Sequence, residues 1–302
     1  MNKIYQVHSS YINSRLDRWF RRNVCDVPQS LIEKNIRKGK IKINDKKKKS
    51  SYKLQKDDQI TLYNIEFIKK PNIKTKDFYK PSRKDLSYSS QIFIENNEDF
   101  AVINKPSGIA VQSGTKSKKN ILDILRKTKE FDGTVPYTVH RIDKETTGIL
   151  IVAKNRKFAQ LFTSLFRIRK IHKIYLCICI GLLDKNKGTF KDDLFHYEGD
   201  KKIITKAITH FEILNTNKNY SLLKLIPETG RKHQLRKQLL MRGCPVLGDD
   251  KYRLSKSHNK RGTLMLHAYK IRFSIAGKKY SFTADPPLSF KKTINEKYLK
   301  IS

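Results

Sequence analysis

The stretch His140–Lys154, HRIDKETTGILIVAK, places one polar loop directly before one buried strand. Its first half is polar and carries Asp143. Its second half, Gly148–Ala153, is a short apolar run suited to a strand inside a sheet. An Asp beside Thr and Gly most often stabilises a turn. The same placement also puts a carboxylate against a core strand, where it can be activated for chemistry, so these residues alone leave both interpretations open.

The sequence around this stretch adds more strands than helices. Short apolar or alternating runs predict strands at Phe100–Asn104, Lys173–Ile180, Tyr269–Ile275 and Lys279–Thr283. One helix is expected after the capping residue Asn155, and another from about His233 to Met241, ending at Gly243. Because no regular alternation of strand and helix appears, the predicted class is α+β with a mixed, largely antiparallel sheet.

The chain divides by composition into two domains and a linker. Residues 1–65 predict a small α/β unit, with two helices followed by a strand at Lys40–Asn44 and a returning strand at Gln59–Tyr63. Its second helix is expected to start around Pro28 and to be capped by Gly39. Residues 66–88 are rich in Lys, Pro, Ser and Asp and lack periodicity, which is typical of a linker. Residues 89–302 form the second domain.

Charge is the strongest compositional signal. The 302 residues contain 65 Lys and Arg against 28 Asp and Glu, a formal net charge of +37. Such a field attracts polyanions, either nucleic acid or an anionic membrane surface, and biased codon usage is a further source of lysine. On the first domain the cations share one helix and one strand, which favours a continuous surface for a phosphate backbone; they are Lys34, Arg37, Lys38, Lys40 and Lys42.

Several common site patterns are absent from the sequence. It has no glycine-rich nucleotide motif and no HExxH, and Cys177 and Cys179 lack the second close pair that a zinc site needs. We therefore expect no cofactor and no metal. The N-terminus has no apolar core like that of a secretion signal, and no apolar run approaches the roughly 18 residues of a membrane span. We expect a cytoplasmic protein without a membrane partner.

The segment HRIDKETTGILIVAK resembles the signature of the RluA-type pseudouridine synthases, and the invariant Asp of that family falls on Asp143. Three further blocks resemble the other motifs of the family and occur in the same order; they are FAVINKPSGIAVQSG, KIYLCICIG and LIPETGRKHQLRKQLLMRGCPVLGDDKYR with LMLHAYKIRF. Together the four blocks extend the resemblance over most of residues 92–285. In the first domain, RLDRWFRRN and VPQSLIEKNIRKGKIKIN resemble an S4-type RNA-binding domain.

The resemblance implies a cofactor-free isomerisation of uridine to pseudouridine. Asp143 would act as nucleophile at C1′ or as base at C2′, and Arg236 would keep its carboxylate charged. Tyr175 would stack on the everted uracil. Arg141 would prop the RNA open or bind its backbone, and Arg231 is a candidate phosphate ligand. The chain departs from the family at Lys237-Gln238, where an apolar residue and a His are usual, which bears on helix packing.

The likeness points to large-subunit (23S) ribosomal RNA, free or in an assembling particle, as the partner, with no obligate protein partner. A second hypothesis is a catalytically inert RNA-binding factor of ribosome assembly. A third is another base-directed enzyme such as a nucleosidase, for which the sequence supplies no activated water. A pure binder needs no buried carboxylate in a basic cleft, so the presence of Asp143, Tyr175 and Arg236 together favours the isomerase.

Overall fold

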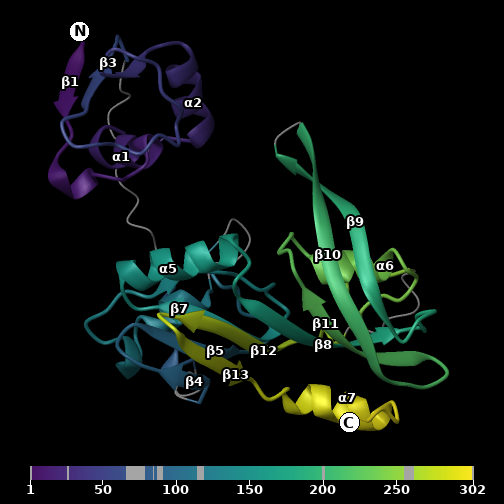
Figure 1. Ribbon diagram of the computed structural model, residues 1–302. Coiled ribbons are helices and arrows are strands. Elements are labelled where there is room, and N and C mark those ends of the chain that lie inside the picture. Colours follow the sequence, from purple (N-terminus) through teal and green to yellow (C-terminus); the bar gives the residue numbers. More distant parts are fainter. Residues whose placement is uncertain are drawn as a thin grey trace. The chain divides into compact units, whose positions relative to one another are not determined.

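The computed structural model describes residues 2–25, 27–65, 79–83, 85–86, 91–113, 119–198, 201–254 and 262–300. The chain forms two compact units, residues 1–77 and 78–302, whose elements Figure 1 labels. Most of the predicted linker, residues 66–88, lies outside the described residues. None of the described helices is long and apolar enough to cross a membrane.

The first unit is a three-stranded antiparallel sheet with two helices. Its order along the chain is β1 (Lys3–Gln6), α1 (Leu16–Asn23), α2 (Gln29–Arg37), β2 (Ile41–Ile43) and β3 (Gln59–Leu62), and a short 3₁₀ turn, η1 (Ser9–Tyr11), follows β1. The strand order is β1-β3-β2, so β3 is central. The predicted strands are present, whereas β1 was not predicted, and α2 begins one residue after Pro28, which serves as its N-cap.

The core of the first unit follows from helical spacing. Leu16, Trp19 and Phe20 of α1 are buried against Ile32 and Ile36 of α2 and against the inward-facing residues of the sheet. The opposite face of α2 carries exposed cations. Burying an apolar side chain of this size contributes about 1.5–3 kcal/mol, so the unit has an apolar core of its own.

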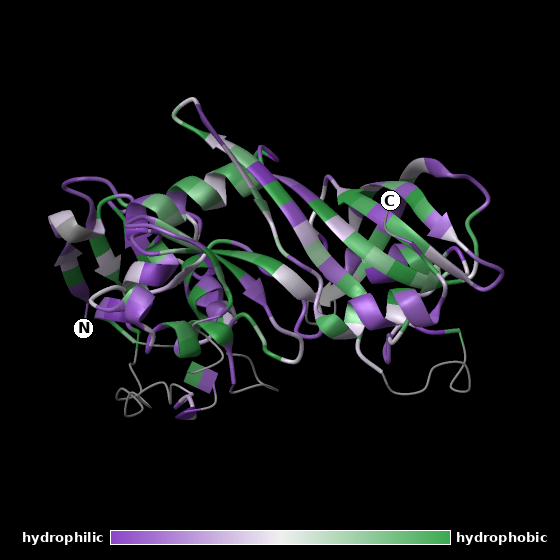
Figure 2. Ribbon diagram, turned by 90° about the horizontal axis from the view of Figure 1, so that it is seen from below, coloured by the Kyte–Doolittle hydropathy of each residue, from purple (hydrophilic) through white to green (hydrophobic). Residues whose placement is uncertain are grey.

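The second unit is built on one long sheet with strand order β4-β5-β7-β12-β8-β11-β10-β9. The strands are β4 (Phe93–Asn96), β5 (Phe100–Lys105), β6 (Tyr137–Thr138), β7 (Thr147–Ala153), β8 (His172–Ile180), β9 (Lys187–Glu198), β10 (Lys201–Thr216), β11 (Tyr220–Pro227), β12 (Leu266–Ile275) and β13 (Lys278–Thr283). All pairs are antiparallel except β7 with β12, which confirms the predicted class. Figure 2 shows hydrophobic and hydrophilic residues alternating along the longest strands of the sheet.

Three main helices cover this sheet: α5 (Arg156–Arg167), α6 (Gln234–Leu240) and α7 (Leu288–Glu296). The shorter α4 (Ile121–Leu125) and the turn η2 (Lys129–Phe131) contribute buried residues to the same core cluster as β5. Leu239 of α6 packs on Cys177, which faces one side of β8, and Phe290 of α7 packs on Ile178, which faces the other. The alternation predicted for Lys173–Ile180 therefore supports one helix on each face of the sheet, as Figure 1 shows.

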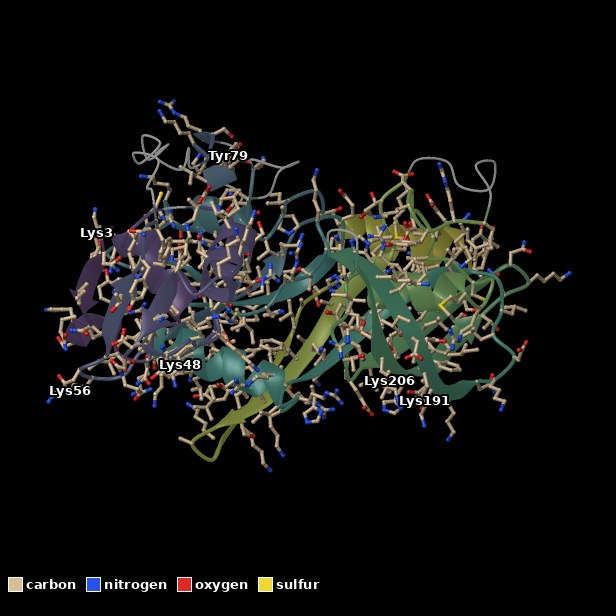
Figure 3. The ribbon with its side chains drawn as sticks, turned by 90° about the horizontal axis from the view of Figure 1, so that it is seen from above. Lys3, Lys48, Lys56, Tyr79, Lys191 and Lys206 are labelled. Atoms are coloured by element: carbon tan, nitrogen blue, oxygen red, sulfur yellow. The ribbon has the colours of Figure 1, made fainter. Side chains whose placement is uncertain are left out.

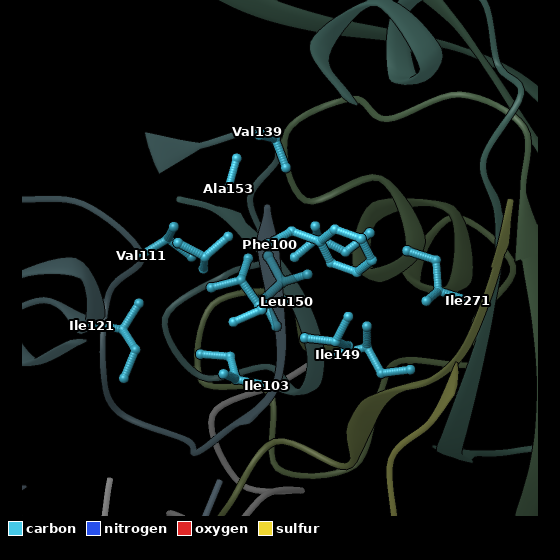
Figure 4. Packing of buried hydrophobic residues seen from close by; sticks show 14 of the residues in the cluster. Phe100, Ile103, Val111, Ile121, Val139, Ile149, Leu150, Ala153 and Ile271 are labelled. Carbon is cyan, nitrogen blue, oxygen red and sulfur yellow. The ribbon is translucent and has the colours of Figure 1, made fainter. Parts of the chain in front are cut away.

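Phe100 lies at the centre of the largest core cluster (Figure 4). Its ring meets Phe162 of α5 edge-on at 5.2 Å and Phe273 of β12 at 6.1 Å. Asn155 caps α5 as predicted, since its side-chain oxygen accepts from the Phe158 N–H at 2.9 Å. These contacts fix α5 over the strands that carry the polar loop 140–146.

The parallel seam between β7 and β12 places that loop. Thr147 pairs with His267, and Gly148 pairs with Ala268. Gly148 has a φ of +104°, and a Cβ there would lie 2.3 Å from the Ala268 carbonyl oxygen. Only glycine allows the two backbones to approach this closely. The strand therefore begins at a fixed point, four residues after Asp143.

Residues at the end of the predicted linker belong to the second unit. The Tyr79 N–H donates to Asp123 at 2.9 Å, and the Tyr79 hydroxyl donates to Asp85 at 2.8 Å. Asp85 also forms an ion pair with Lys119. Burial opposes ionisation of Asp85, but hydrogen bonds from Lys119, Tyr79 and Ser82 prevail and lower its pKa.

Candidate active site

A cavity of about 820 Å³ opens between the loop 139–146, the end of α5 with the start of β8, and the turn from β11 into α6. Two of its lining residues are acidic, Asp143 and Glu228. Seven are Lys or Arg, and the excess favours a negatively charged ligand; they are Arg141, Arg167, Arg169, Lys173, Arg231, Lys232 and Arg236.

Asp143 and Arg236 meet in this cavity although 93 residues separate them. Arg236 Nη1 donates to Asp143 Oδ2 at 3.3 Å. The Asp143 side chain is 23% exposed and that of Arg236 is 8% exposed. The carboxylate therefore faces the cavity while its cation lies behind it in the protein.

Asp249 orients the guanidinium of Arg236. Arg236 Nε and Nη2 donate to the two oxygens of Asp249 at 2.6 and 2.7 Å, and Asp249 is fully buried. Burial favours a lower pKa for Arg236, but the hydrogen bonds and charge of Asp249 outweigh it and raise that pKa. The ring of Tyr252 lies 5.0 Å from the guanidinium carbon and covers it. Because the two hydrogen bonds to Asp249 fix the planar guanidinium, its remaining nitrogen, Nη1, faces Asp143.

His233 completes the surroundings of Asp143. Its Nε2 lies 3.7 Å from Asp143 Oδ1, and its Nδ1 shares a hydrogen bond with the Tyr252 hydroxyl at 2.8 Å. Burial lowers the pKa of His233, and the charge of Asp143 offsets only part of that effect. The residue has a φ of +54° at the start of α6, an unusual conformation for a non-glycine residue. The sequence predicted His233 at the start of a helix, and the geometry adds its contact with Asp143.

Tyr175 lies on β8 and lines the same cavity. Burial, assisted by the charge of Asp143, raises the pKa of the Tyr175 phenol. The hydroxyl therefore stays protonated at neutral pH, so it can donate a hydrogen bond but is a poor base. The flat ring remains suited to stacking against a base.

Lys105 fixes the loop that carries Asp143. Its ammonium is fully buried and donates to the carbonyl oxygens of Pro106, Ile109 and Lys144 at 2.6, 3.0 and 3.1 Å. Burial lowers the pKa of Lys105 to about 7. The Gly108 N–H also donates to Lys144 O at 3.0 Å. The carbonyl oxygen of Lys144, the residue after Asp143, therefore accepts two hydrogen bonds from the segment 105–108.

The departure from the family pattern at Gln238 builds a buried polar ladder under α6. The Gln238 amide accepts from the Thr209 hydroxyl at 2.6 Å and donates to Asp192 at 2.8 Å. One turn earlier, Gln234 donates to the same Thr209 hydroxyl at 2.9 Å and accepts from Thr229 at 2.7 Å. Both Gln side chains are thus satisfied, and α6 is fixed to β9 and β10 with Arg236 facing the cavity.

The other predicted site residues fall into two groups. Arg141 and Arg231 are exposed and line the cavity. Arg231 Nε donates to Lys206 O at 3.0 Å, and this hydrogen bond holds the Arg231 side chain against β10. The remaining five belong to the first unit. Two lie on α2 and one caps its C-terminus, and the other two lie just before β2 and on it; they are Lys34, Arg37, Lys38, Lys40 and Lys42.

Further cations lie on the long arm formed by β9 and β10. Figure 3 shows the side chains of Lys191 and Lys206 extending from these two strands. On the same arm, the exposed side chains of Phe195 and Ile204 lie opposite each other on the paired strands. The ammonium of Lys202 lies 4.7 Å from the centre of the Phe195 ring. The basic character of the molecule thus continues beyond the cavity.

Sequence reasoning did not single out Asp249, Tyr252 or Lys105. Asp249 and Tyr252 stand in the segment GDDKYR, and Lys105 stands in FAVINKPSG, so both segments were noted without a role for these side chains. Asp249 could have been noticed as an acidic residue within a segment that resembles a motif of the family. Its role became visible only when folding placed it behind Arg236.

The arrangement suits a reaction at a carboxylate in a confined, basic pocket. Asp143 has one long contact with Arg236, so its oxygens remain accessible to a ligand. A positioned carboxylate of this kind can attack a carbon or remove a proton. Within the described residues no group of three or more His, Cys, Asp or Glu side chains could hold a metal ion.

Known proteins include relatives of this chain. The sequence pattern of the RNA pseudouridylate synthase family matches residues 99–240. The chain is 30% identical to ribosomal large subunit pseudouridine synthase C of Buchnera aphidicola subsp. Schizaphis graminum, over 97% of this chain and 96% of the relative. It is 31% identical to the protein of the same name from Rickettsia bellii, over 94% of this chain and 98% of the relative.

The fold of the second unit is also found among solved structures. The human protein RNA pseudouridylate synthase domain containing 4 superposes with a TM-score of 0.62 at 24% identity, over 71% of this chain and 96% of that chain. This likeness concerns the fold. Together with the matched family pattern and the relatives that align over nearly the whole length, it shows that the chain belongs to the RNA pseudouridylate synthase family.

Proposed function

We propose that this protein isomerises uridines to pseudouridines in large-subunit ribosomal RNA, with Asp143 as the reacting carboxylate. The observation that carries the proposal is the contact of Asp143 with Arg236 at 3.3 Å in a basic cavity. It is supported by relatives named ribosomal large subunit pseudouridine synthase C, which align with the chain from end to end. The segment VPQSLIEKNIRKGKIKIN also most resembles synthase C.

The chemistry needs a carboxylate and a closed pocket. The bond from C1′ to uracil N1 breaks, the base turns, and a new bond joins C1′ to C5, after which C5 loses its proton and N1 gains one. Asp143 would either attack C1′ and form an ester that breaks when C5 bonds to C1′, or remove the proton at C2′ and return it when the new bond forms. Arg236 would hold the carboxylate in its charged form through this step, and Asp249 would hold Arg236.

The pocket would receive the uridine after it leaves the stack. Extruding a base from paired RNA costs about a few kcal/mol. Stacking on the ring of Tyr175 would recover part of this cost, since base–aromatic stacking contributes about 1–3 kcal/mol. Arg141 and Arg231, at the rim of the same cavity, would bind the phosphates on either side of the extruded nucleotide.

The first unit would serve as an S4-type RNA-binding domain. Its α2 exposes Lys34, Arg37 and Lys38 on the face opposite its buried residues, so these cations are available to a ligand. Lys40 and Lys42 follow on or beside β2, where Lys42 lies 4.8 Å from the Tyr63 ring centre. A basic helix and strand of this kind can bind an RNA backbone without reading its sequence.

An inert RNA-binding factor is the alternative, and the geometry favours the enzyme. Asp249 and Arg236 are both buried, which is costly for charged groups unless the site uses them. A binder gains nothing from an acid that faces a basic cavity and repels phosphate. We place the reaction in the cytoplasm, with ribosomal RNA as the partner and no further protein required.

The test is a map of pseudouridines in large-subunit ribosomal RNA from cells that lack this protein. We expect one or more pseudouridines to disappear and to return when the wild-type chain is supplied. A map identical to that of the parent cells would contradict the proposed substrate. Loss of ribosome assembly with an unchanged map would instead support the inert factor.

A further inference from the structure

The wall of the cavity formed by the end of α5 and the start of β8 is basic and has no assigned role. It contributes Arg167, Arg169 and Lys173 to the cavity lining. Arg167 and Arg169 are exposed. In the described part of the chain, no acidic side chain forms an ion pair with either arginine, so their charges are available to a ligand.

Arg169 has a backbone conformation that disfavours arginine. Its φ is +58°, in the left-handed region. Its N–H donates to Phe166 O at 3.2 Å, and the next N–H, of Lys170, donates to Leu165 O at 2.9 Å. This pair of hydrogen bonds defines a common helix ending whose left-handed residue is usually glycine, because a Cβ is strained there.

Two other helices of the chain end in the same way with glycine. Gly243, with a φ of +67°, closes α6 by the same two hydrogen bonds, and Gly39, with a φ of +72°, closes α2. A third, α7, uses Tyr298 at φ +51°, and this residue is 88% exposed and is not among those that line the cavity. Tyr298 therefore provides a matched position without contact with the site.

The helix end does not explain the arginine at this position. Cations near a helix C-terminus are favourable, but Arg167 and Lys170 already stand in the last turn and just after it. Residues with strained backbone conformations cluster at active sites and ligand-binding sites. His233, the other strained residue in the cavity lining, lies within 3.7 Å of Asp143.

We propose that Arg169 is a binding residue for the RNA backbone, and that its guanidinium holds a phosphate beside the extruded nucleotide. The inference rests on the proposed function for the nature of the ligand. Arg169 and Arg167 would act on one wall, while Arg231 and Lys232 act on the wall formed by the β11–α6 turn. The ligand class is a phosphodiester, which arginine binds through paired N–H donors.

The test compares Arg169→Gly, Arg169→Lys and the control Tyr298→Gly in the full-length chain. The probe is an unmodified transcript of large-subunit ribosomal RNA, and the measurements are Tm, RNA affinity across a salt series, and pseudouridine formation. Both glycine variants should keep or raise Tm, because each removes left-handed strain. Arg169→Gly alone should weaken binding about three- to tenfold and lower the salt slope by about 0.7–0.9. Arg169→Lys should keep most of the slope.

Two results would overturn the inference. One is an affinity and salt slope of Arg169→Gly equal to those of the wild type. The other is a Tm of Arg169→Gly well below that of Tyr298→Gly, which would make Arg169 a structural residue of the helix end. If the wild-type chain binds RNA with the Arg169-dependent slope but forms no pseudouridine, the proposed function fails while this inference stands.

Discussion

The guanidinium of Arg236 is shared unequally between two carboxylates. Asp249 takes the two parallel hydrogen bonds at 2.6 and 2.7 Å, and Asp143 takes one at 3.3 Å. Paired, short bonds to a charged acceptor are the stronger kind. Asp249 therefore fixes the cation, while Asp143 keeps a single, longer hydrogen bond to it. This division leaves the cavity-facing carboxylate free to react.

Replacing Asp249 with Asn tests this division. The variant keeps the shape but removes the negative charge behind Arg236, so the guanidinium should shift toward Asp143. We expect kcat to fall about 100-fold, the order of loss that a displacement of about 1 Å causes in an active site. RNA affinity should change little. Asp250→Asn, at the exposed neighbouring position, is the control. A normal kcat in Asp249→Asn would show that Arg236 needs no such support.

At the scale of single residues, the sequence singled out two side chains that meet in the cavity, and it missed the residue that supports one of them. Asp143 and Arg236 were found because motifs carry them, and their contact follows the expected pairing. Asp249 was missed because its role depends on a fold that brings residue 249 behind α6. The left-handed backbone of Arg169 and His233 was equally hidden, since no local pattern predicts strain in an Arg or a His.

At the scale of elements, the seam between β7 and β12 carries a buried histidine. His267 is fully buried; its Nδ1 shares a hydrogen bond with Thr147 at 2.8 Å, and its Nε2 donates to Ala284 O at 2.9 Å. Burial, opposed in part by the bond to Ala284, lowers the pKa of His267 to about 4. The neutral ring fits both partners, whereas a charged ring would present a second N–H to the Thr147 hydroxyl.

The lowered pKa of His267 predicts that the free energy of unfolding decreases in acid. Between about pH 6.5 and the folded pKa, the unfolded chain binds the proton and the folded chain does not, so stability falls as the pH falls. His267 should thus cost the second unit about 2 kcal/mol of unfolding free energy between pH 7 and pH 5. Urea unfolding of His267→Gln should show a smaller loss over this range. His210→Gln, at an exposed strand position, should keep the wild-type loss, and equal losses in all three would contradict the prediction.

Most strands were predictable, but their order was not. Alternation along Lys173–Ile180 and the apolar run at Gly148–Ala153 each fixed a strand locally. The parallel pairing of β7 with β12 joins segments about 120 residues apart and leaves no local sequence signal. The strand β1 was missed because its four residues are mostly exposed and show no apolar alternation.

At the scale of the whole molecule, positive charge is distributed over both units. Exposed cations occur on α2 of the first unit and around the cavity of the second, in a chain of formal charge +37. Each phosphate contact releases counterions, so affinity for RNA should depend steeply on salt. The sequence predicted this basic character and the α+β class from composition and pattern. The arm formed by β9 and β10 was not predicted, since its strands were not recognised.

Neutralising α2 tests the contribution of the first unit in the full chain. Changing Lys34, Arg37 and Lys38 together to Gln should lower the salt slope of RNA binding by up to about 2–3, at roughly 0.9 for each lost phosphate contact. Binding at low salt should weaken while kcat on saturating RNA is unchanged. An equal change of charge on β13 and the loop before β11 serves as control, through Lys278, Lys279 and Lys218. A slope that falls equally in both variants would mean that only net charge matters.

The proposed reaction depends on the carboxylate of Asp143 as the group that acts on the RNA. The most direct measurement is pseudouridine formation by Asp143→Asn on an unmodified large-subunit ribosomal RNA transcript, with RNA affinity measured in parallel. We expect no pseudouridine above background and an affinity close to that of the wild type. Pseudouridine formation by the Asn variant at a rate near that of the wild type would contradict the assignment of the reacting group.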